Sequence, residues 1–486
     1  MMKKLSLRIL ASLMALLLIM GLAACGGSGD TEGSSAPAES SQPVSDSSDT
    51  PVSDDPSSDA SATTTTTTGS GKTTRPIVAN KKAATWAEIK AKIPASAKGT
   101  TLHVYDWNPQ SEVPGMSNMH KKFTEETGII VDYKIVNHNS YFTKIAAEVA
   151  AKNAPDAVRI QNVNRQNLVN LQPMQNLGYD FTDAAWDKNV MNAYTFNGNL
   201  YGVNMVGSPY YCAALVYYNK NLIETYGLDD PYDLWKDGEW TWDALWDMCE
   251  EFLDEADGDD FIGLSTMAFM EYQHAYNKPT ITYDHKNNTF KHNLQDANYV
   301  KSWQIYANNY DKGLISQALT NNDAFDGGKL LFNVSMGIAS RSGSSYFRNL
   351  RSQGAVACVP LPALKKGAKD YQVLGEVQAF GIPKTAKNPA LVPYYLRYYF
   401  DADNYNMNNF YNVEHAAEVT KYVQSKNPAI GYAGAVMTKE TTGFVTSQFI
   451  DELKQGGAAN VKMKLDSFVP TVDAAIKEAQ SFYGSL

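Results

Sequence analysis

The chain has 486 residues, of which 44% are hydrophobic and 19% charged, and its formal net charge is −10. At roughly 100–200 residues per domain, this length predicts two or three domains with enough apolar content for sizeable cores. The acidic balance argues against a nucleic-acid partner, which would require a basic face.

The first 24 residues have the pattern of a secretory signal. Three positive charges within residues 3–8 precede an apolar run over residues 9–20, and small residues then lead to Cys25. A basic start, a short apolar segment and small residues before a cleavage position are typical of export signals. The run is short for a membrane-spanning helix. We therefore predict that residues 1–24 are removed during export.

The end of this segment indicates a lipid anchor. The sequence Leu-Ala-Ala-Cys-Gly at residues 22–26 resembles a bacterial lipobox. In lipoproteins that motif directs diacylglyceryl transfer to the cysteine, here Cys25, followed by cleavage before it. Two acyl chains are sufficient for stable membrane anchoring.

Residues 25–97 are assigned to the lipidated cysteine and a linker. Ser, Thr, Asp, Pro and Gly dominate from Gly26 to about Asn80, with six consecutive threonines at 63–68. Such a composition can bury almost no apolar surface, so we predict a disordered tether.

From Thr101 strand and helix patterns alternate. Strand patterns occur at 102–107, 129–136 and 155–160, and helix patterns at 119–127 and 141–152. This β-α-β-α-β order predicts an α/β layer with a largely parallel sheet. Ligands of such sheets bind beyond the carboxyl ends of the strands, which directs attention to Trp107, Asn108, Tyr141, Gln161 and Asn162.

Strand and helix patterns also alternate in the second half of the chain. The patterns predict strands at 215–218, 261–266, 329–334, 355–360 and 376–382, and helices at 242–252, 296–310, 389–400 and 472–482. Thr241 is expected to cap the first of these helices. Two α/β lobes are the simplest architecture.

Enzyme and metal signatures are largely missing from the sequence. It has no zinc-protease, paired-cysteine, nucleophile-elbow or dinucleotide motif, and its seven histidines lack metal-ligand spacing. We therefore predict no cofactor and no metal site. A pair of carboxylates for glycoside hydrolysis cannot be recognised from sequence, so a surface glycoside hydrolase stays open as an alternative. If Cys25 is lipidated, three cysteines remain, namely Cys212, Cys249 and Cys358. An odd number argues against a disulfide framework and favours buried free cysteines.

Aromatic residues with polar groups are abundant, with 29 tyrosines against 18 phenylalanines. Flat rings can stack on the apolar face of a sugar, while amide and charged side chains bond its hydroxyls. The candidates at predicted loop positions are Trp107, Tyr141, Tyr210, Tyr211, Tyr272 and Tyr346, each with core packing as the competing interpretation. For Trp240, Trp242, Trp246 and Trp303, which lie in helix-like patterns, core packing is favoured.

Several segments, in a shared order along the chain, resemble the extracellular solute-binding proteins of carbohydrate ABC importers, the family that includes maltodextrin-binding proteins. They are Phe-Thr-Glu-Glu-Thr-Gly-Ile at 123–129, Ala-Pro-Asp-Ala-Val at 154–158, Asn-Gly-Asn-Leu-Tyr-Gly-Val at 197–203, Val-Tyr-Tyr-Asn-Lys at 216–220 with Thr-Trp-Asp at 241–243, Phe-Asp-Gly-Gly-Lys at 325–329 and Gly-Ile-Pro-Lys-Thr-Ala-Lys-Asn-Pro at 381–389.

This resemblance implies a two-lobed, periplasmic-binding-protein-like fold of type II over residues 98–486. Each lobe would be a mostly parallel sheet flanked by helices, and strand hinges would connect the lobes. The first lobe would comprise about 98–207 and 360–402, and the second about 208–359 and 403–486. Ligand would bind in the cleft between the lobes, and hinge closure would bury it.

The resemblance also places the ligand contacts. They fall after the first strand, at the end of the third strand, at the first hinge crossing, in loops of the second lobe and on the returning strand. These positions hold Trp107, Asn108, Gln161, Asn162, Asn164, Tyr210, Tyr211, Glu271, Tyr272, Arg341, Tyr346 and Glu376, and the strand-end rule adds Tyr141.

The function expected from the resemblance is binding, not catalysis. A monomeric lipoprotein on the extracellular face of the bacterial cell membrane, in a Gram-positive organism, would capture a carbohydrate, expected to be an oligosaccharide. It would deliver this ligand to the membrane-spanning subunits of an ABC permease. A sugar-binding or sensing lipoprotein without a permease is the alternative from the same class.

Overall fold

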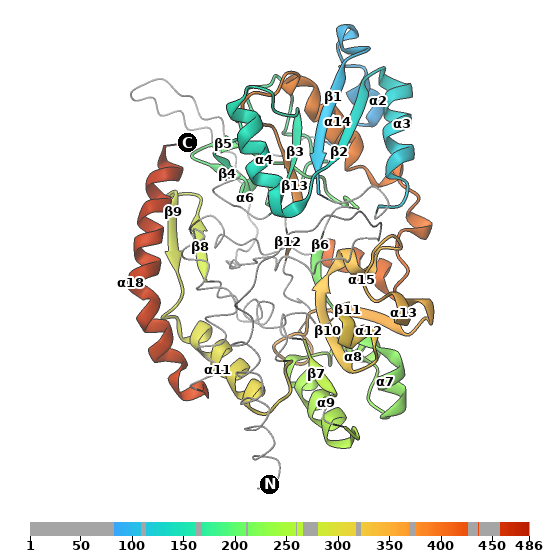
Figure 1. Ribbon diagram of the computed structural model, residues 1–486, viewed down its shortest axis with the longest axis vertical. Helices are drawn as coiled ribbons and strands as arrows, with labels where there is room; N and C mark the ends of the chain where they lie inside the picture. Colours follow the sequence, from blue (N-terminus) through green and yellow to red (C-terminus); the bar gives the residue numbers. More distant parts are fainter. Residues whose placement is uncertain are drawn as a thin grey trace, which may run out of the picture. The chain divides into compact units, whose positions relative to one another are not determined.

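The computed structural model describes selected residues of the chain from residue 82 onward (Figure 1). The described residues are 82–107, 113–161, 168–209, 212–258, 260–265, 280–316, 322–368, 375–376, 378–425, 436 and 457–485.

The first sheet is built from the predicted β-α-β-α-β segment. Its strands lie in the order β13-β3-β1-β2, with bounds β1 (Thr101–Asp106), β2 (Ile130–Ile135), β3 (Ala157–Gln161) and β13 (Gln378–Gly381). Strand β1 runs parallel to both β2 and β3, whereas β13 is antiparallel to β3. Helices α3 (Met116–Thr127) and α4 (His138–Ala150) make the crossovers. The prediction of a largely parallel sheet is confirmed for this lobe.

Local sequence signals explain where these helices begin and end. Helix α3 ends at Gly128, which adopts φ 73°, a left-handed conformation that glycine reaches without a steric penalty. Helix α4 begins after Asn137, whose side chain accepts a hydrogen bond from the Asn139 backbone amide at 2.9 Å. It therefore starts three residues before the predicted 141–152.

The second sheet is mixed, so the expectation of a mostly parallel sheet in each lobe is wrong here. Its strands are β6 (Cys212–Asn219), β7 (Ile262–Leu264), β10 (Leu330–Met336), β11 (Val356–Pro360) and β12 (Gly375–Glu376). Strand β6 is antiparallel to β10, β11 and β12, and β10 is parallel to β7. The reason lies in the connectivity, since the chain enters this sheet along β6 and turns back along β11 toward β12 and β13.

The returning strands connect the two sheets. Gly375 and Glu376 pair with Ala213 and Cys212 of β6, and two residues later Gln378 pairs with Gln161 of β3. A short stretch of chain is thus hydrogen-bonded first to one sheet and then to the other, as the predicted strand hinge requires.

Helices and hairpins complete the two lobes. The described residues also form α2 (Trp86–Lys90), η1 (Ala95–Ala97), α6 (Lys188–Ala193), β4 (Thr195–Phe196), β5 (Asn199–Leu200), α7 (Lys220–Thr225), α8 (Pro231–Asp237), α9 (Trp242–Glu255), β8 (Ile281–Asp284), β9 (Thr289–His292), α11 (Ala297–Asp311), α12 (Asn322–Asp326), η3 (Gly337–Ser340), α13 (Arg348–Ser352), η4 (Pro389–Leu391), α14 (Val392–Tyr399), η5 (Ala402–Asn404), η6 (Met407–Asn409), α15 (Ala416–Gln424) and α18 (Gly457–Gly484).

Two of these helices can be compared with the boundaries predicted from the sequence. Thr241 caps α9 as predicted, since its side chain accepts a hydrogen bond from the Ala244 amide at 3.1 Å. The helix predicted at 472–482 is the last part of α18, which continues through Pro470 and packs along α11 and β9 (Figure 1).

Buried hydrophobic residues form two clusters. One lies among β1, α3 and α14, and the other extends from α4 and β6 through the second sheet to α11 and α18. The second contains Trp240, Trp242, Trp246 and Trp303, which confirms the prediction of core packing for these four. Cys249 and Cys358 are buried free cysteines, also as predicted.

The predicted boundary between linker and body requires a correction. Residues 82–97, which the sequence assigned to the linker, include helix α2 and the 3-10 turn η1, with Ile89 and Ala97 buried. Burial of these apolar side chains stabilises the packing of residues 82–97 on the first lobe. The composition of residues 26–80 offers almost no apolar side chains for such burial.

Candidate ligand-binding site

The candidate site begins at Trp107, the residue after β1. Its partly exposed ring meets three rings of α4 edge-on, with centroid distances of 4.9 Å to Tyr141, 5.4 Å to His138 and 6.1 Å to Phe142. The Tyr141 hydroxyl donates to the Tyr105 carbonyl at 2.7 Å and so ties α4 to β1. The first turns of α4 therefore help to hold the Trp107 ring in place.

A buried ion pair supports Trp107 from the sheet. Arg159 of β3 and Asp106 of β1 have side chains that are 1% and 0% exposed, and Arg159 Nη1 lies 3.0 Å and 3.2 Å from the two carboxylate oxygens. The carbon at the centre of the guanidinium group lies 4.8 Å from the Trp107 ring centroid, within cation–π range. Arg159 also donates to the Gln378 side chain, and the Tyr133 hydroxyl donates to Asp106.

The charges at this site follow from burial and from the pair. Burial lowers the pKa of Arg159, but the Asp106 carboxylate outweighs it, so the pKa lies above its usual value and the guanidinium stays charged. Partial burial, and secondly the Arg159 charge, lower the pKa of His138. Near neutral pH the ring beside Trp107 is therefore a neutral imidazole.

The strand crossing brings other predicted residues close to the same edge of the sheet. Gln161 is the last residue of β3 and pairs with Gln378, while Glu376 pairs with Cys212. The Asn204 side chain donates to the Gln378 carbonyl at 2.7 Å and fixes the returning strand. The backbones of Gln161 and Glu376 thus lie on either side of this crossing.

Arg341 and Tyr346 lie in one segment of the second lobe. Arg341 is 1% exposed, and its Nη2 donates to the Pro209 carbonyl at 2.8 Å, directly before the predicted contact Tyr210. Tyr346 is partly exposed and packs against Phe347 with 5.9 Å between ring centroids. Tyr141 and Arg341 are both buried, so in this structure they support neighbouring residues and present no open surface.

The remaining predicted contacts lie outside the described residues. They are Asn108, Asn162, Asn164, Tyr210, Tyr211, Glu271 and Tyr272, together with the side chains of Gln161 and Glu376. Cys25, the predicted lipidation site, lies outside them as well.

Sequence reasoning missed the residues that hold Trp107, namely Asp106, His138, Arg159 and Gln378. A usable signal existed for Arg159, because a lone charge inside the apolar run 157–160 must be paired if that strand is buried. Its partner could not be read from the sequence, since the pairing depends on β1 and β3 lying side by side.

A cavity of about 270 Å³ lies away from this site, between the N-terminal segment and the chain near Tyr179. Among the described residues, no group of three or more His, Cys, Asp or Glu side chains could hold a metal ion.

Comparison with known proteins identifies the family. The sequence profile of the bacterial extracellular solute-binding proteins matches residues 118–430. The chain belongs to this family. No significant match is found among curated proteins. Among the helices of the described residues, none is long and apolar enough to cross a membrane.

Solved structures of other proteins share this fold. An extracellular solute-binding protein from Staphylococcus aureus in complex with maltose has a TM-score of 0.55 at 16% identity, covering 78% of this chain and 98% of its own. The maltotriose-binding protein of Thermus thermophilus, bound with maltotriose, has a TM-score of 0.54 at 16% identity over 78% of this chain and 99% of its own. A cyclo/maltodextrin-binding protein complexed with maltotetraose has a TM-score of 0.54 at 16% identity over 79% of this chain and 96% of its own. These similarities confirm the predicted two-lobed α/β fold of this solute-binding protein.

Proposed function

We propose that this solute-binding protein captures a carbohydrate, and most specifically an oligosaccharide, and delivers it to an ABC permease. The observation that carries the proposal is the partly exposed ring of Trp107, held from two sides at the carboxyl edge of the first sheet. Binding without catalysis is sufficient for this role.

Trp107 suits a sugar because its ring is already fixed before a ligand arrives. The ring contacts aromatic rings of α4 and lies under the Arg159 guanidinium group, so little side-chain entropy remains to be lost on binding. A flat, immobile ring is an efficient surface for the apolar C–H face of a pyranose, while nearby amides bond its hydroxyls.

The other predicted contacts complete the proposed site. Asn108, Gln161, Asn162 and Asn164 would bond hydroxyls from the first lobe, Tyr210 and Tyr211 from the crossing, and Glu271, Tyr272, Tyr346 and Glu376 from the opposite side. Tyr141 and Arg341 would act through the residues they support. The sugars named for the three similar structures, maltose, maltotriose and maltotetraose, favour a carbohydrate as the ligand class.

The proposed location is the extracellular face of a Gram-positive cell membrane, where a lipidated Cys25 anchors a monomer. The supporting feature is the lipobox-like sequence at residues 22–26 behind a secretory signal. Intact-mass measurement of the membrane-extracted protein should show cleavage before Cys25 and a diacylglyceryl group, both lost in Cys25→Ser.

Isothermal titration calorimetry against a panel of oligosaccharides and non-sugar solutes tests the ligand class. We expect saturable binding of at least one oligosaccharide, without turnover of that sugar in the same samples. Binding confined to amino acids, peptides or other non-sugar solutes would refute the carbohydrate assignment, and hydrolysis of the bound glycan would favour an enzyme. Permease genes beside the gene for this protein, with loss of cellular uptake on their deletion, would support delivery. The absence of such genes, or unchanged uptake after their deletion, would favour a sensing role.

A further inference from the structure

The segment 84–93 lies ahead of the region that matches the solute-binding family. The family match begins at residue 118 and the first strand at Thr101, yet residues 84–93 contact three separate parts of the first lobe. We call residues 84–93 the clasp. Its central helix α2 has only five residues, too few to be stable alone, so its stability must come from these contacts.

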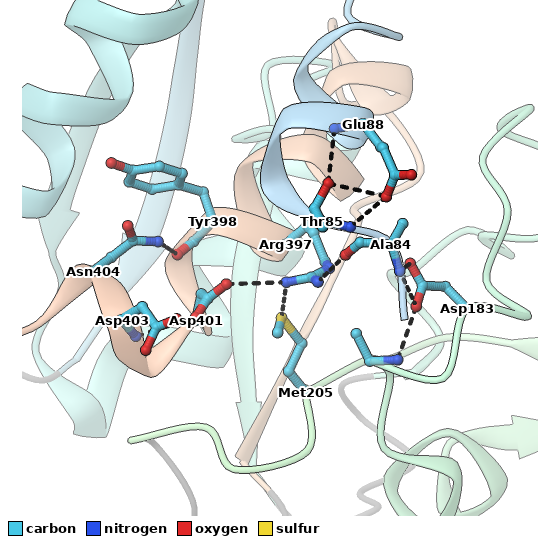
Figure 2. Close-up of polar contacts among 11 residues, drawn as sticks. Ala84, Thr85, Glu88, Asp183, Met205, Arg397, Tyr398, Asp401, Asp403 and Asn404 are labelled. Carbon is cyan, nitrogen blue, oxygen red and sulfur yellow. Dashed lines mark hydrogen bonds and ion pairs between the residues drawn. The ribbon is translucent and has the colours of Figure 1, made fainter. Parts of the chain in front are cut away.

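Two buried charged side chains hold the start of the clasp (Figure 2). The Ala84 amide lies 3.2 Å and 3.1 Å from the two carboxylate oxygens of Asp183, and Arg397 Nη2 donates to the Ala84 carbonyl at 2.8 Å. Asp183 is 5% exposed and Arg397 is 4% exposed. Buried charges require hydrogen-bond partners. The Ala84 amide provides one for Asp183, and the Ala84 carbonyl provides one for Arg397.

The middle of the clasp packs on α3 and α14. The Trp86 ring centroid lies 4.7 Å from that of Tyr398 and 6.2 Å from that of Phe123, and its indole nitrogen donates to Glu126 at 2.7 Å. Lys90 adds an ion pair with Glu126 at 3.4 Å. Burial acts to raise the pKa of Glu126, but the hydrogen bonds from Trp86 and Tyr398 together lower it, so the carboxylate stays charged.

Two further contacts set the ends of the clasp. A capping box joins Thr85 and Glu88, as Figure 2 shows, with the Thr85 amide 2.7 Å from the Glu88 carboxylate. At the other end the Tyr394 hydroxyl donates to the Lys92 carbonyl at 3.2 Å. Ile89, between these ends, is 3% exposed.

We propose that the clasp is the mechanical attachment of the N-terminal tether to the first lobe, an inference that rests on the lipid anchor proposed at Cys25. Without it, the tether would lead directly into β1, whose far end carries Asp106 and Trp107. With it, a pull on the tether is borne by Asp183, by α3 and by Arg397 and Tyr398 of α14. The strand that supports the candidate site is thereby separated from the motion of the anchor.

Limited proteolysis of the full chain with trypsin tests this proposal, because lysines lie on both sides of the contacts. Lys81 and Lys82 precede the clasp, whereas Lys90, Lys92 and Lys98 lie within it or after it. We expect a product that begins at Ala83 and persists. In Trp86→Ala, cleavage after Lys90 and Lys92 should be faster by about tenfold or more, since proteolysis follows the population of the open segment. The exposed Ala87 offers a matched control, and Ala87→Ser should behave as the wild type.

A second variant separates the proposed contacts from ring packing. Ala84→Pro removes the amide that donates a hydrogen bond to Asp183 and leaves the Trp86 side chain unchanged. This variant should also make the clasp accessible to trypsin. Unchanged circular dichroism of both variants would show that the lobes remain folded. Cleavage of the wild type after Lys92 as fast as after Lys82, or less than about a twofold effect of both variants, would overturn the proposal.

Discussion

The guanidinium group of Arg159 lies against the Trp107 ring at 4.8 Å while its Nη1 lies 3.0 Å and 3.2 Å from the carboxylate oxygens of Asp106. One buried charge thus performs two tasks. It pairs with the carboxylate of Asp106 at the end of β1, and it supports the aromatic ring of the next residue, Trp107. The position of the ring that we propose to stack on the sugar therefore depends on an ion pair between β1 and β3.

Arg159→Met tests the structural part of this arrangement. The substitution removes the cation and leaves the buried Asp106 carboxyl group without its ion-pair partner, so the free energy of unfolding should fall by about 3–5 kcal/mol. Urea denaturation at neutral pH measures the change. A loss of less than about 1 kcal/mol would contradict the assigned role.

The double variant Asp106→Asn/Arg159→Met serves as its control. With both charges removed, no isolated ion remains in the interior, and part of the lost stability should return. If Asp106→Asn lowers the free energy of unfolding as much in the Arg159→Met background as it does in the wild type, the two residues are not coupled.

His120 predicts a specific loss of stability in acid. Its Nε2 lies 3.0 Å from the Tyr395 hydroxyl, and burial lowers its pKa from 6.5 to about 4, partly opposed by Asp106. Above pH 6.5 the imidazole is neutral in both states. Between about pH 6.5 and 4 the unfolded chain binds the proton and the folded protein does not, so stability falls by up to about 1.4 kcal/mol per pH unit.

His120→Gln isolates this contribution, because the amide can still hydrogen-bond Tyr395 but does not titrate. Urea unfolding from pH 7 to 4 should show a shallower decline for His120→Gln than for the wild type. Parallel curves would show that His120 is not the source of the pH dependence.

Gly381 at the end of β13 predicts a steric constraint on the returning strand. A Cβ there would lie 2.6 Å from the Leu171 Cδ1 atom and 3.0 Å from the Tyr201 carbonyl oxygen. Since that backbone oxygen cannot move aside easily, Gly381→Ala should destabilise the protein by about 1–3 kcal/mol. At Gly484 a Cβ meets nothing within 4 Å, so Gly484→Ala is the matched control. Equal melting temperatures for the two variants would contradict the predicted clash.

The sequence predicted the elements of the first lobe well because hydrophobic period and end signals coincide there. Gly128 ends α3 and parallel strands follow each other through helices, so local pattern and topology agree. The second sheet was wrongly expected to be mostly parallel, since strand direction there depends on how β6 enters and β11 leaves. Helix α18 runs through Pro470, although a proline inside a sequence pattern ordinarily indicates a boundary.

At the candidate site, sequence reasoning singled out Trp107 but not the residues that contact its partly exposed ring. Trp107 follows an apolar strand, a position that strand-end rules identify. The Arg159–Asp106 pair and the edge contact of His138 depend on residues distant in sequence meeting across strands, which periodicity does not encode. The clasp was missed because its few apolar residues follow a long polar linker.

Titration of Trp107→Ala with the oligosaccharide that the wild type binds most tightly is the most direct test of the central claim. Loss of the stacking surface should weaken binding by about tenfold or more, equivalent to about 1.4 kcal/mol, and Trp107→Phe should retain part of the affinity. Tyr232→Phe, which loses a surface hydrogen bond to Glu418 on the second lobe, should bind like the wild type. If folded Trp107→Ala binds the sugar within about twofold of the wild-type affinity, Trp107 is not the platform on which the ligand rests.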